Sequence, residues 1–195
     1  MTIVSLFDYT GNMVLPWAEA GHQCECYDIQ HPPGLSPGPH KNITFVGADL
    51  RDAKPFLHDV KILFAFPPCD HLAVSGARWF QGKGLRALSS AIELFAVATE
   101  CAAVAGAPYM IENPVSTIST YWRKPDHKFD PCDYGDPYTK KTCLWTGNGF
   151  IMPVKQPVEP TEGSKMHFVS PGPNRAAIRS ETPMGFARAV FAANS

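Results

Sequence analysis

The stretch KILFAFPPCD, residues 61–70, is the part of the sequence that decides the fold. Lys61–Phe66 is an uninterrupted apolar run of strand length, which is typical of a strand that is buried on both faces of a parallel sheet. Pro67 and Pro68 end it, because proline lacks the amide hydrogen that a sheet ladder needs and also restricts the residue before it. The pattern therefore predicts a buried strand with Cys69 at its carboxyl end.

Strand and helix patterns alternate on both sides of this run. The sequence predicts further strands at Ile3–Phe7, Gln23–Asp28, Ile43–Val46, Tyr109–Glu112 and Thr142–Trp145. It predicts helices at Met13–Ala20, Leu85–Ala105 and Thr182–Ala193. The Pro- and Gly-rich residues 31–40 are expected to form a loop, and residues 116–138 have no regular pattern. Strands that alternate with helices predict an α/β fold with an open, mostly parallel sheet.

Length and composition favour one globular domain over residues 1–195, with a short Pro/Gly-rich segment at 147–180. The formal net charge is −1, whereas proteins that hold long nucleic acids by charge alone are usually basic. The six cysteines form no CxxC pair and no zinc-finger spacing, so no metal is expected. The first residues lack a signal-peptide pattern, and the apolar helix near 91–104 is too short to span a bilayer. We expect a cytoplasmic protein without membrane contact.

The turn after the first predicted strand, Phe7–Asn12, has a layout that lets the backbone approach a ligand closely. Asp28 follows at the end of the second strand. An acidic residue at this place commonly hydrogen-bonds a ribose hydroxyl of an adenosine-containing cofactor. The alternative is an ordinary turn followed by a strand-end carboxylate, since the turn contains a single glycine, Gly11.

Cys69 is the candidate nucleophile, because a thiol attacks carbon once its surroundings favour the thiolate. The alternative is a small buried hydrophobic residue. Residues 75–80, SGARWF, follow it and combine small, cationic and aromatic side chains. Such a segment can close over a planar base and its phosphate, or its aromatic rings can simply anchor in the core.

Glu112 and Asn113 end another predicted strand on the same edge as Cys69. A thiolate can add to C6 of cytosine when an acid protonates or hydrogen-bonds N3, after which C5 attacks an electrophile. Glu112 is the candidate acid; the alternative is a carboxylate that faces solvent or caps a helix. Two cationic pairs, Arg123-Lys124 and Lys140-Lys141, are candidates for phosphate or base contacts, or are solvated surface.

In this order, the motifs resemble the cytosine-C5 DNA methyltransferase family, most closely its compact phage-type members. The resemblance is carried by SLFDYTGNMVLPWAEAGH (residues 5–22), FPPCDHLAVSG (66–76), IENPVS (111–116), TKKTCLWTG (139–147) and TPMGFARAVFAAN (182–194). It implies a fold like that of S-adenosylmethionine (SAM)-dependent methyltransferases, with Cys69 as the catalytic thiol and Glu112 at cytosine N3. The last motif is implied to be a helix that returns to the cofactor pocket.

The binding residues are expected at the same strand ends. SAM contacts are expected from residues at four strand ends: Phe7, Asp8, Thr10, Gly11, Asp28, Asp49 and Pro67. Substrate contacts are expected at Ser75, Arg78, Trp79, Asn113, Lys140 and Lys141. If the acceptor is duplex DNA, Arg78, Trp79 and Phe80 are the candidates to fill the gap that a flipped base leaves, with Lys83 near the phosphates.

The sequence departs from the family at three places. Tyr9 and Asn12 replace glycines of the first motif, and Lys140-Lys141-Thr142 replaces an Arg-x-Arg pattern. The interval 147–180 is much too short for the target-recognition domain of the enzymes that act on DNA.

The expected function is therefore SAM-dependent methyl transfer to cytosine C5 in DNA. Two alternatives remain: modification of a free cytidine nucleotide or single-stranded nucleic acid, and an inactive subunit that binds nucleic acid or a partner. A homodimer, or a partner chain that contacts DNA, is compatible with each of them.

Overall fold

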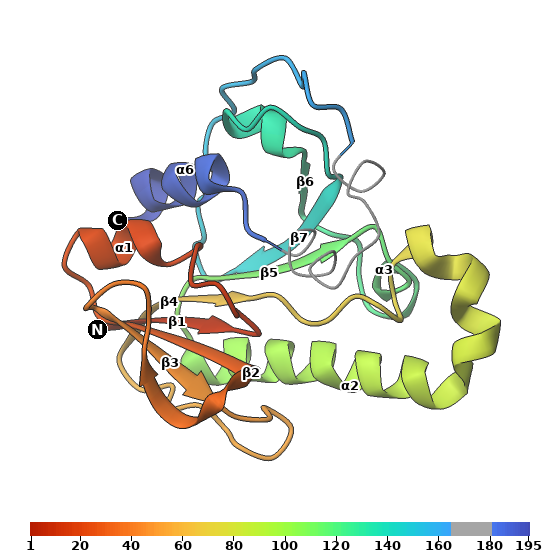
Figure 1. Cartoon of the computed structure of the whole chain (residues 1–195), viewed down its shortest axis with the longest axis horizontal. Coiled ribbons are helices and arrows are strands. Elements are labelled where there is room, and N and C mark those ends of the chain that lie inside the picture. Colours follow the sequence, from red (N-terminus) through yellow and green to blue (C-terminus); the bar gives the residue numbers. More distant parts are fainter. Residues whose placement is uncertain (165–180) are drawn as a thin grey trace.

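A mixed sheet of seven strands crosses the part of the chain that the computed structural model describes, residues 1–164 and 181–195 (Figure 1). Its order is β3-β2-β1-β4-β5-β7-β6. The strands are β1 (Thr2–Leu6), β2 (Cys24–Pro37), β3 (Ile43–Gly47), β4 (Val60–Ala65), β5 (Tyr109–Pro114), β6 (His127–Phe129) and β7 (Thr142–Gly147). The first five strands pair in parallel, whereas β7 runs antiparallel to both β5 and β6. The predicted α/β fold with a mostly parallel sheet is confirmed, and it is consistent with a Rossmann-like architecture.

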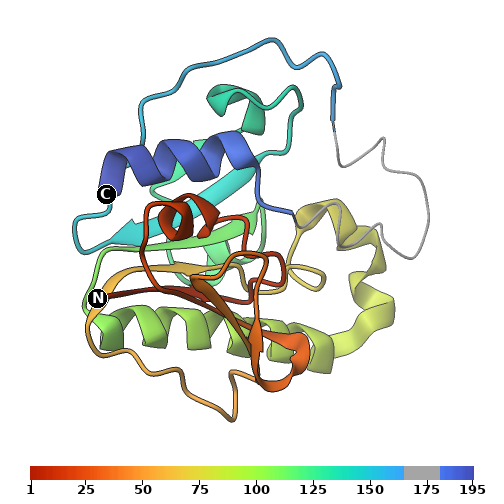
Figure 2. The same ribbon diagram turned by 60° about the vertical axis from the view of Figure 1, so that its left-hand side comes forward.

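Helices cover both faces of this sheet. The helical segments are α1 (Leu15–Glu19), the 3₁₀ helix η1 (Val74–Trp79), α2 (Phe80–Ala105), α3 (Ile118–Tyr121), the 3₁₀ helix η2 (Pro131–Tyr134) and α6 (Met184–Asn194). Helix α2 crosses one face, and α1 and α6 lie on the other (Figures 1 and 2). The result is a three-layered arrangement in which strands β1 and β4 are buried from both sides.

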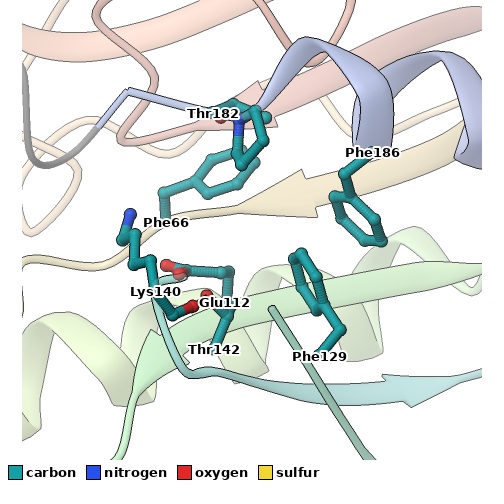
Figure 3. A pocket seen from close by; sticks show the side chains of 8 residues that line it. Phe66, Glu112, Phe129, Lys140, Thr142, Thr182 and Phe186 are labelled. Atoms are coloured by element: carbon teal, nitrogen blue, oxygen red, sulfur yellow. Dashed lines mark hydrogen bonds between the residues drawn. The ribbon is translucent and has the colours of Figure 1, made fainter. Parts of the chain in front are cut away.

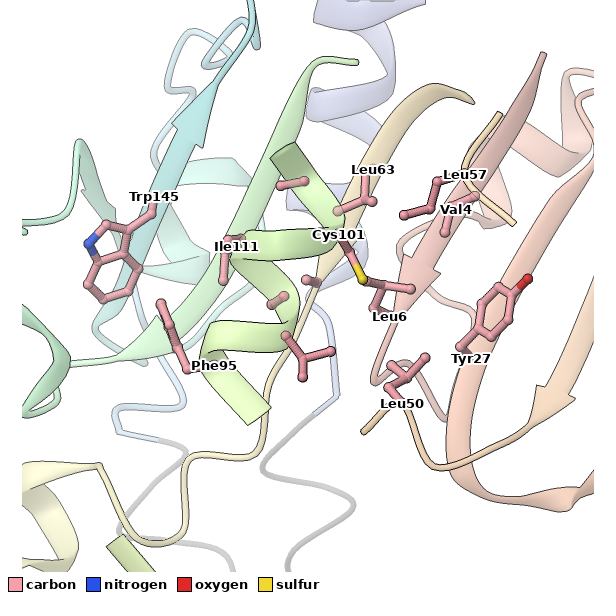
Figure 4. Close-up of a cluster of buried hydrophobic side chains, with 14 of the residues drawn as sticks. Val4, Leu6, Tyr27, Leu50, Leu57, Leu63, Phe95, Cys101, Ile111 and Trp145 are labelled. Atoms are coloured by element: carbon pink, nitrogen blue, oxygen red, sulfur yellow. The ribbon is translucent and has the colours of Figure 1, made fainter. Parts of the chain in front are cut away.

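The two faces bury separate hydrophobic clusters. Under α2, side chains of the helix such as Phe95 and Cys101 meet Leu63, Ile111 and Trp145 of the sheet (Figure 4). On the opposite face, Trp17 of α1 and Phe186 of α6 pack over Ile62 and Phe64 of β4. Consecutive residues of β4 thus enter different clusters, which explains why its sequence is apolar at every position.

Most predicted elements are confirmed with small changes at their ends. The main error concerns residues 31–40, which were expected to form a loop. The first seven of them belong to β2, because the chain turns back after His31. It then pairs with β3 in the reversed direction, with Leu35, Ser36 and Pro37 opposite Val46, Phe45 and Thr44. Residues 116–138, which lack a regular pattern, contain the short elements α3, β6 and η2.

Helix α2 begins at Phe80, five residues before the predicted start. Gly84 produces a kink within it, since its φ of 76° and ψ of 176° lie outside the helical region. Together with η1 it forms a helical segment of 32 residues that is long and apolar enough to cross a membrane by length and composition. The expectation that the apolar helix is too short to do so is therefore wrong. Core helices of soluble proteins can be equally long and apolar. The cytoplasmic location therefore stays a prediction.

The order of the first five strands places a topological switch point between β1 and β4. At this point the connections leave the sheet toward opposite faces, and ligands of such sheets bind beyond the carboxyl ends of the strands. The turns that follow β1, β4 and β5 all lie at this edge. Those three turns contain the residues that the sequence singles out.

Candidate functional site

The turn after β4 holds Cys69 in a fixed position. The backbone amides of Leu72 and Ala73 both donate to the Cys69 carbonyl oxygen, at 2.9 Å each. Two residues before the cysteine, the carbonyl oxygen of Pro67 accepts a 3.0 Å hydrogen bond from Asn113 Nδ2 at the end of β5. The Asn113 side chain is completely buried, so this bond ties the β4 and β5 strand ends together.

Glu112 and Lys140 meet at a pocket on the neighbouring strand ends (Figure 3). Because β7 is antiparallel to β5, the residues just before β7 lie at the carboxyl end of β5. Figure 3 shows the Lys140 side chain rising beside the Glu112 carboxyl group. The pocket is small, with a cavity volume of about 10 Å³, and is lined by Phe66, Glu112, Phe129, Lys140, Thr142, Thr182, Pro183 and Phe186.

Burial and charge shift the proton affinity of Glu112 in opposite directions. Burial raises the pKa of the Glu112 carboxyl group above its usual value, while the Lys140 ammonium group lowers it, with burial the larger effect. A carboxyl group with a raised pKa keeps its proton closer to neutral pH. Glu112 can therefore donate a proton or a hydrogen bond to a ring nitrogen in the pocket.

The charges of Glu112 and Lys140 also act on the Cys69 thiol. Burial raises the pKa of this thiol to about 11, and the carboxylates of Glu112 and Asp70 add to the increase. Lys140 acts in the opposite direction. Cys69 and Glu112 are thus close enough to influence each other electrostatically, and protonation of Glu112 removes part of what disfavours the thiolate.

The turn after β1 is organised around Asp8, whose carboxylate points back into its own turn. It accepts hydrogen bonds from Ser5 Oγ at 2.7 Å, from the Gly11 amide at 2.8 Å and from the amide and hydroxyl of Thr10. Phe7 has a φ of 56°, a conformation that costs energy for a residue with a side chain. Asp8, which was expected to contact the cofactor, therefore stabilises the turn. The backbone of Phe7–Gly11 is left to face a ligand.

Asp28 and Asp49 follow the neighbouring strands but differ in availability. Asp28 Oδ1 accepts bonds from the Gln30 amide and side chain, and Oδ2 has no hydrogen-bond partner among the described residues. Both oxygens of Asp49 are bound to the Arg51 guanidinium. The site thus fits an adenosine-containing cofactor at the β1 turn and at Asp28, where one carboxylate oxygen can accept a ribose hydroxyl. Asp49 is already neutralised by its ion pair.

The last motif lies against both parts of the site. Asn12 Nδ2 donates to Glu181 Oε1 at 3.2 Å, which connects the β1 turn to the segment that leads into α6. Thr182, Pro183 and Phe186 line the pocket that contains Glu112. The segment that leads into α6 thus lies beside the first turn, while the expected return of this helix to a cofactor pocket stays a prediction.

The remaining predicted residues fall into two groups. Asn113 and Pro67 are buried and bonded to each other, so they position the strand ends. Ser75, Arg78, Trp79 and Lys141 are exposed at the same edge, and Lys141 does not line the pocket. The structure therefore separates a buried group around Cys69 and Glu112 from an exposed group on η1 and α2.

The sequence did not indicate several residues of the site. Phe66 and Phe129 line the pocket, and His31 stacks between Phe45 at 4.0 Å and Tyr9 at 5.3 Å beside the β1 turn. These contacts join residues from different strands and depend on the reversal of β2 and on the position of β6. No local pattern in the sequence encodes them.

Comparison with protein-family models and with curated proteins finds no match to this chain. The strand ends bring together a thiol and a carboxyl group at the ends of β4 and β5, a lysine whose charge acts on both, and the β1 turn next to Asp28.

Proposed function

We propose that the chain transfers a methyl group from SAM to C5 of cytosine, through a covalent bond between Cys69 and C6. The observation that carries this proposal is the placement of Cys69 and Glu112 at the ends of the paired strands β4 and β5, which the Asn113–Pro67 hydrogen bond ties together. Addition of a thiol to C6 requires an acid at N3, and we expect one substrate ring to contact both groups.

The protein groups perform the covalent part of the reaction. The Cys69 thiol loses its proton to solvent, and the sulfur forms a bond to C6 while Glu112 donates its proton to N3. Lys140 stabilises the negative charge on sulfur before the attack, since its ammonium group lowers the pKa of Cys69. After C5 has taken the methyl group, a base or water removes the C5 proton, and the electron pair of that bond expels the Cys69 thiolate from C6. Glu112 then recovers its proton from N3.

SAM supplies an electrophilic methyl group when it is bound. The Phe7–Gly11 backbone and Asp28 would hold it, because they lie at the switch point of the sheet and one Asp28 oxygen is available. Gly11 is required there, since its φ is 72° and a Cβ atom would lie 3.3 Å from the Phe45 ring.

The strand order also supports a cofactor on one side of the switch point and the acceptor on the other. Cofactors of doubly wound sheets bind over the first strands, and here β1 and β2 carry the turn and Asp28. The acceptor would then occupy the β4–β5 side, at Cys69 and Glu112. The Asn12–Glu181 contact closes the edge between the two sides.

The test is transfer of labelled methyl from SAM to duplex DNA, single-stranded DNA and free cytidine nucleotides, with Cys69→Ser in parallel. We expect label in at least one acceptor and a loss of about 10³-fold or more in the variant. Cys132→Ser, which replaces another partly buried cysteine on η2, should stay within about twofold of the original rate. Transfer that persists in Cys69→Ser, or no label in any acceptor, would contradict the proposal.

A further inference from the structure

A cationic arm projects from the edge that contains Cys69. Between Asp70 and Glu93 the chain has no acidic residue, but it contains Arg78, Lys83 and Arg86. Helix η1, the outer part of this arm, contains no buried residue. The net charge of −1 therefore hides a local concentration of positive charge beside the candidate nucleophile.

One arginine–tryptophan pair lies on this arm. The Arg78 guanidinium lies 4.9 Å from the centre of the Trp79 ring, which is 60% exposed. The pair combines a stacking surface with a positive charge. A second pair, Arg123 with Trp122, is engaged elsewhere, because Arg123 forms an ion pair with Asp126 at 2.7 Å and donates to the Thr146 carbonyl oxygen near the start of β5.

The base of the arm is hydrogen-bonded next to Cys69 to the segment that follows β5. The Val74 amide donates to the Val115 carbonyl oxygen at 3.0 Å, and the Thr117 amide donates to that of Leu72 at 3.1 Å. These bonds hold the start of η1 against the segment that enters α3. In Figure 1, η1 and α3 accordingly lie together beyond the carboxyl ends of β4 and β5.

We infer that the acceptor is a single-stranded polynucleotide, of which one base stacks on Trp79 and a neighbouring base enters a hollow of the arm, while a phosphate meets Arg78. This inference rests on the proposed function, for which it names the substrate class. Single strands present open base faces to aromatic rings, which is how proteins bind them without a sequence-reading domain. A free nucleotide has a single base and would use only one of these two positions.

A hollow on the inner side of the arm fits the same ligand. Its cavity volume is about 330 Å³, and its lining includes Phe80, Leu88 and Lys83. Its mainly apolar wall next to a lysine suits an unstacked base with its phosphate. A duplex offers no such base without the cost of unpairing.

The test measures binding of a fluorescent, cytosine-containing oligodeoxynucleotide in the absence of SAM. The same strand annealed to its complement, and dCMP as competitor, provide the comparison. Trp79→Ala should weaken single-strand binding by about tenfold. Arg78→Gln should reduce the slope of log affinity against log salt by about 0.7. Phe56→Ala, which removes a 72% exposed ring from the loop between β3 and β4, is the matched control and should change neither quantity.

Three results would overturn the inference: tighter binding to the duplex, full competition by dCMP at equal concentration, or an unchanged affinity in Trp79→Ala. The outcome is separable from that of the proposed function. Methyl transfer to duplex or dCMP without single-strand binding removes the inference and retains the reaction. Single-strand binding with the expected Trp79 effect but no methyl transfer to any acceptor retains the binding surface and contradicts the reaction.

Discussion

The Cys69–Glu112 region and the arm formed by η1 and the first residues of α2 share one edge of the sheet but are held in different ways. Cys69 and Glu112 are partly buried on strand ends that are cross-bonded through the completely buried Asn113. On the arm, Trp79 and Leu85 are 60% and 83% exposed. The groups that need a fixed geometry thus lie on strand ends that packing holds in place, and the groups that meet a long, variable acceptor lie on a segment with little packing.

The largest expected effect in the buried region is that of Glu112→Gln. The variant cannot protonate N3, and we expect methyl transfer to fall by about 10² to 10⁴-fold. At neutral pH, however, the variant should be more stable than the original protein. Burial holds the pKa of Glu112 above its usual value, so the protonated carboxyl stabilises the fold at acid pH and this contribution is lost as the pH rises through the folded-state pKa.

Urea unfolding of both proteins as a function of pH measures this change. Stability relative to the original protein should increase for Glu112→Gln as the pH rises above the usual pKa of glutamate. A variant that becomes steadily less stable over the same pH range would show that the carboxylate is held in its charged form.

The reactivity of Cys69 provides the next test. With the thiol pKa near 11, the rate of alkylation by iodoacetamide should rise about tenfold per pH unit between about pH 8 and 10. Lys140→Gln should slow the reaction further, because Lys140 lowers the pKa of the thiol. Peptide mapping separates Cys69 from the partly buried Cys132. A rate that is constant above pH 8 would mean that the thiolate is already formed.

Asn113→Ala tests how far the buried region depends on its cross-bond. The substitution leaves the Pro67 carbonyl oxygen without its donor, which should cost about 1–3 kcal/mol of unfolding free energy. Because the bond sets the distance between the β4 and β5 ends, kcat should fall together with stability. Denaturant unfolding and methyl transfer on the same preparations measure both, and an unchanged kcat would separate Asn113 from the alignment of Cys69.

The smallest effect on stability is expected in the arm. Gly84 has a φ of 76° at the kink of α2, so Gly84→Ala disfavours the bent form. A Cβ atom there meets nothing within 4 Å, and the adjoining η1 contributes no buried side chain. We expect the arm to relieve this strain by straightening, so that the free energy of unfolding falls by about 1 kcal/mol, the lower end of the cost of such a conformation. Affinity for the single strand should fall severalfold. A loss of stability as large as that of Asn113→Ala would show that the arm is packed as firmly as the strand ends, which would contradict the comparison.

The sequence predicted the buried region better than its surroundings. The apolar run 61–66 and the polar residues after three strands were sufficient to place Cys69, Glu112 and Asn113 at one edge, because parallel strands end on the same side. The return of β2 was missed, since proline and glycine in HPPGLSP favour a loop locally and the pairing with β3 decides otherwise. The start of α2 was missed because Gly82 and Gly84 have low helix propensity. Phe66 and Phe129 reach the pocket only through the assembled sheet.

The most direct test of the proposed reaction is to trap the covalent bond between Cys69 and cytosine. An oligodeoxynucleotide with 5-fluorocytosine is incubated with the protein and SAM, and digested peptides are analysed by mass spectrometry. Fluorine cannot leave C5 as a proton does, so the C6–sulfur bond should persist. The account predicts a methylated adduct on the peptide that contains Cys69, and none in Cys69→Ser. An adduct on another cysteine, or no adduct while methyl transfer to normal cytosine proceeds, would contradict it.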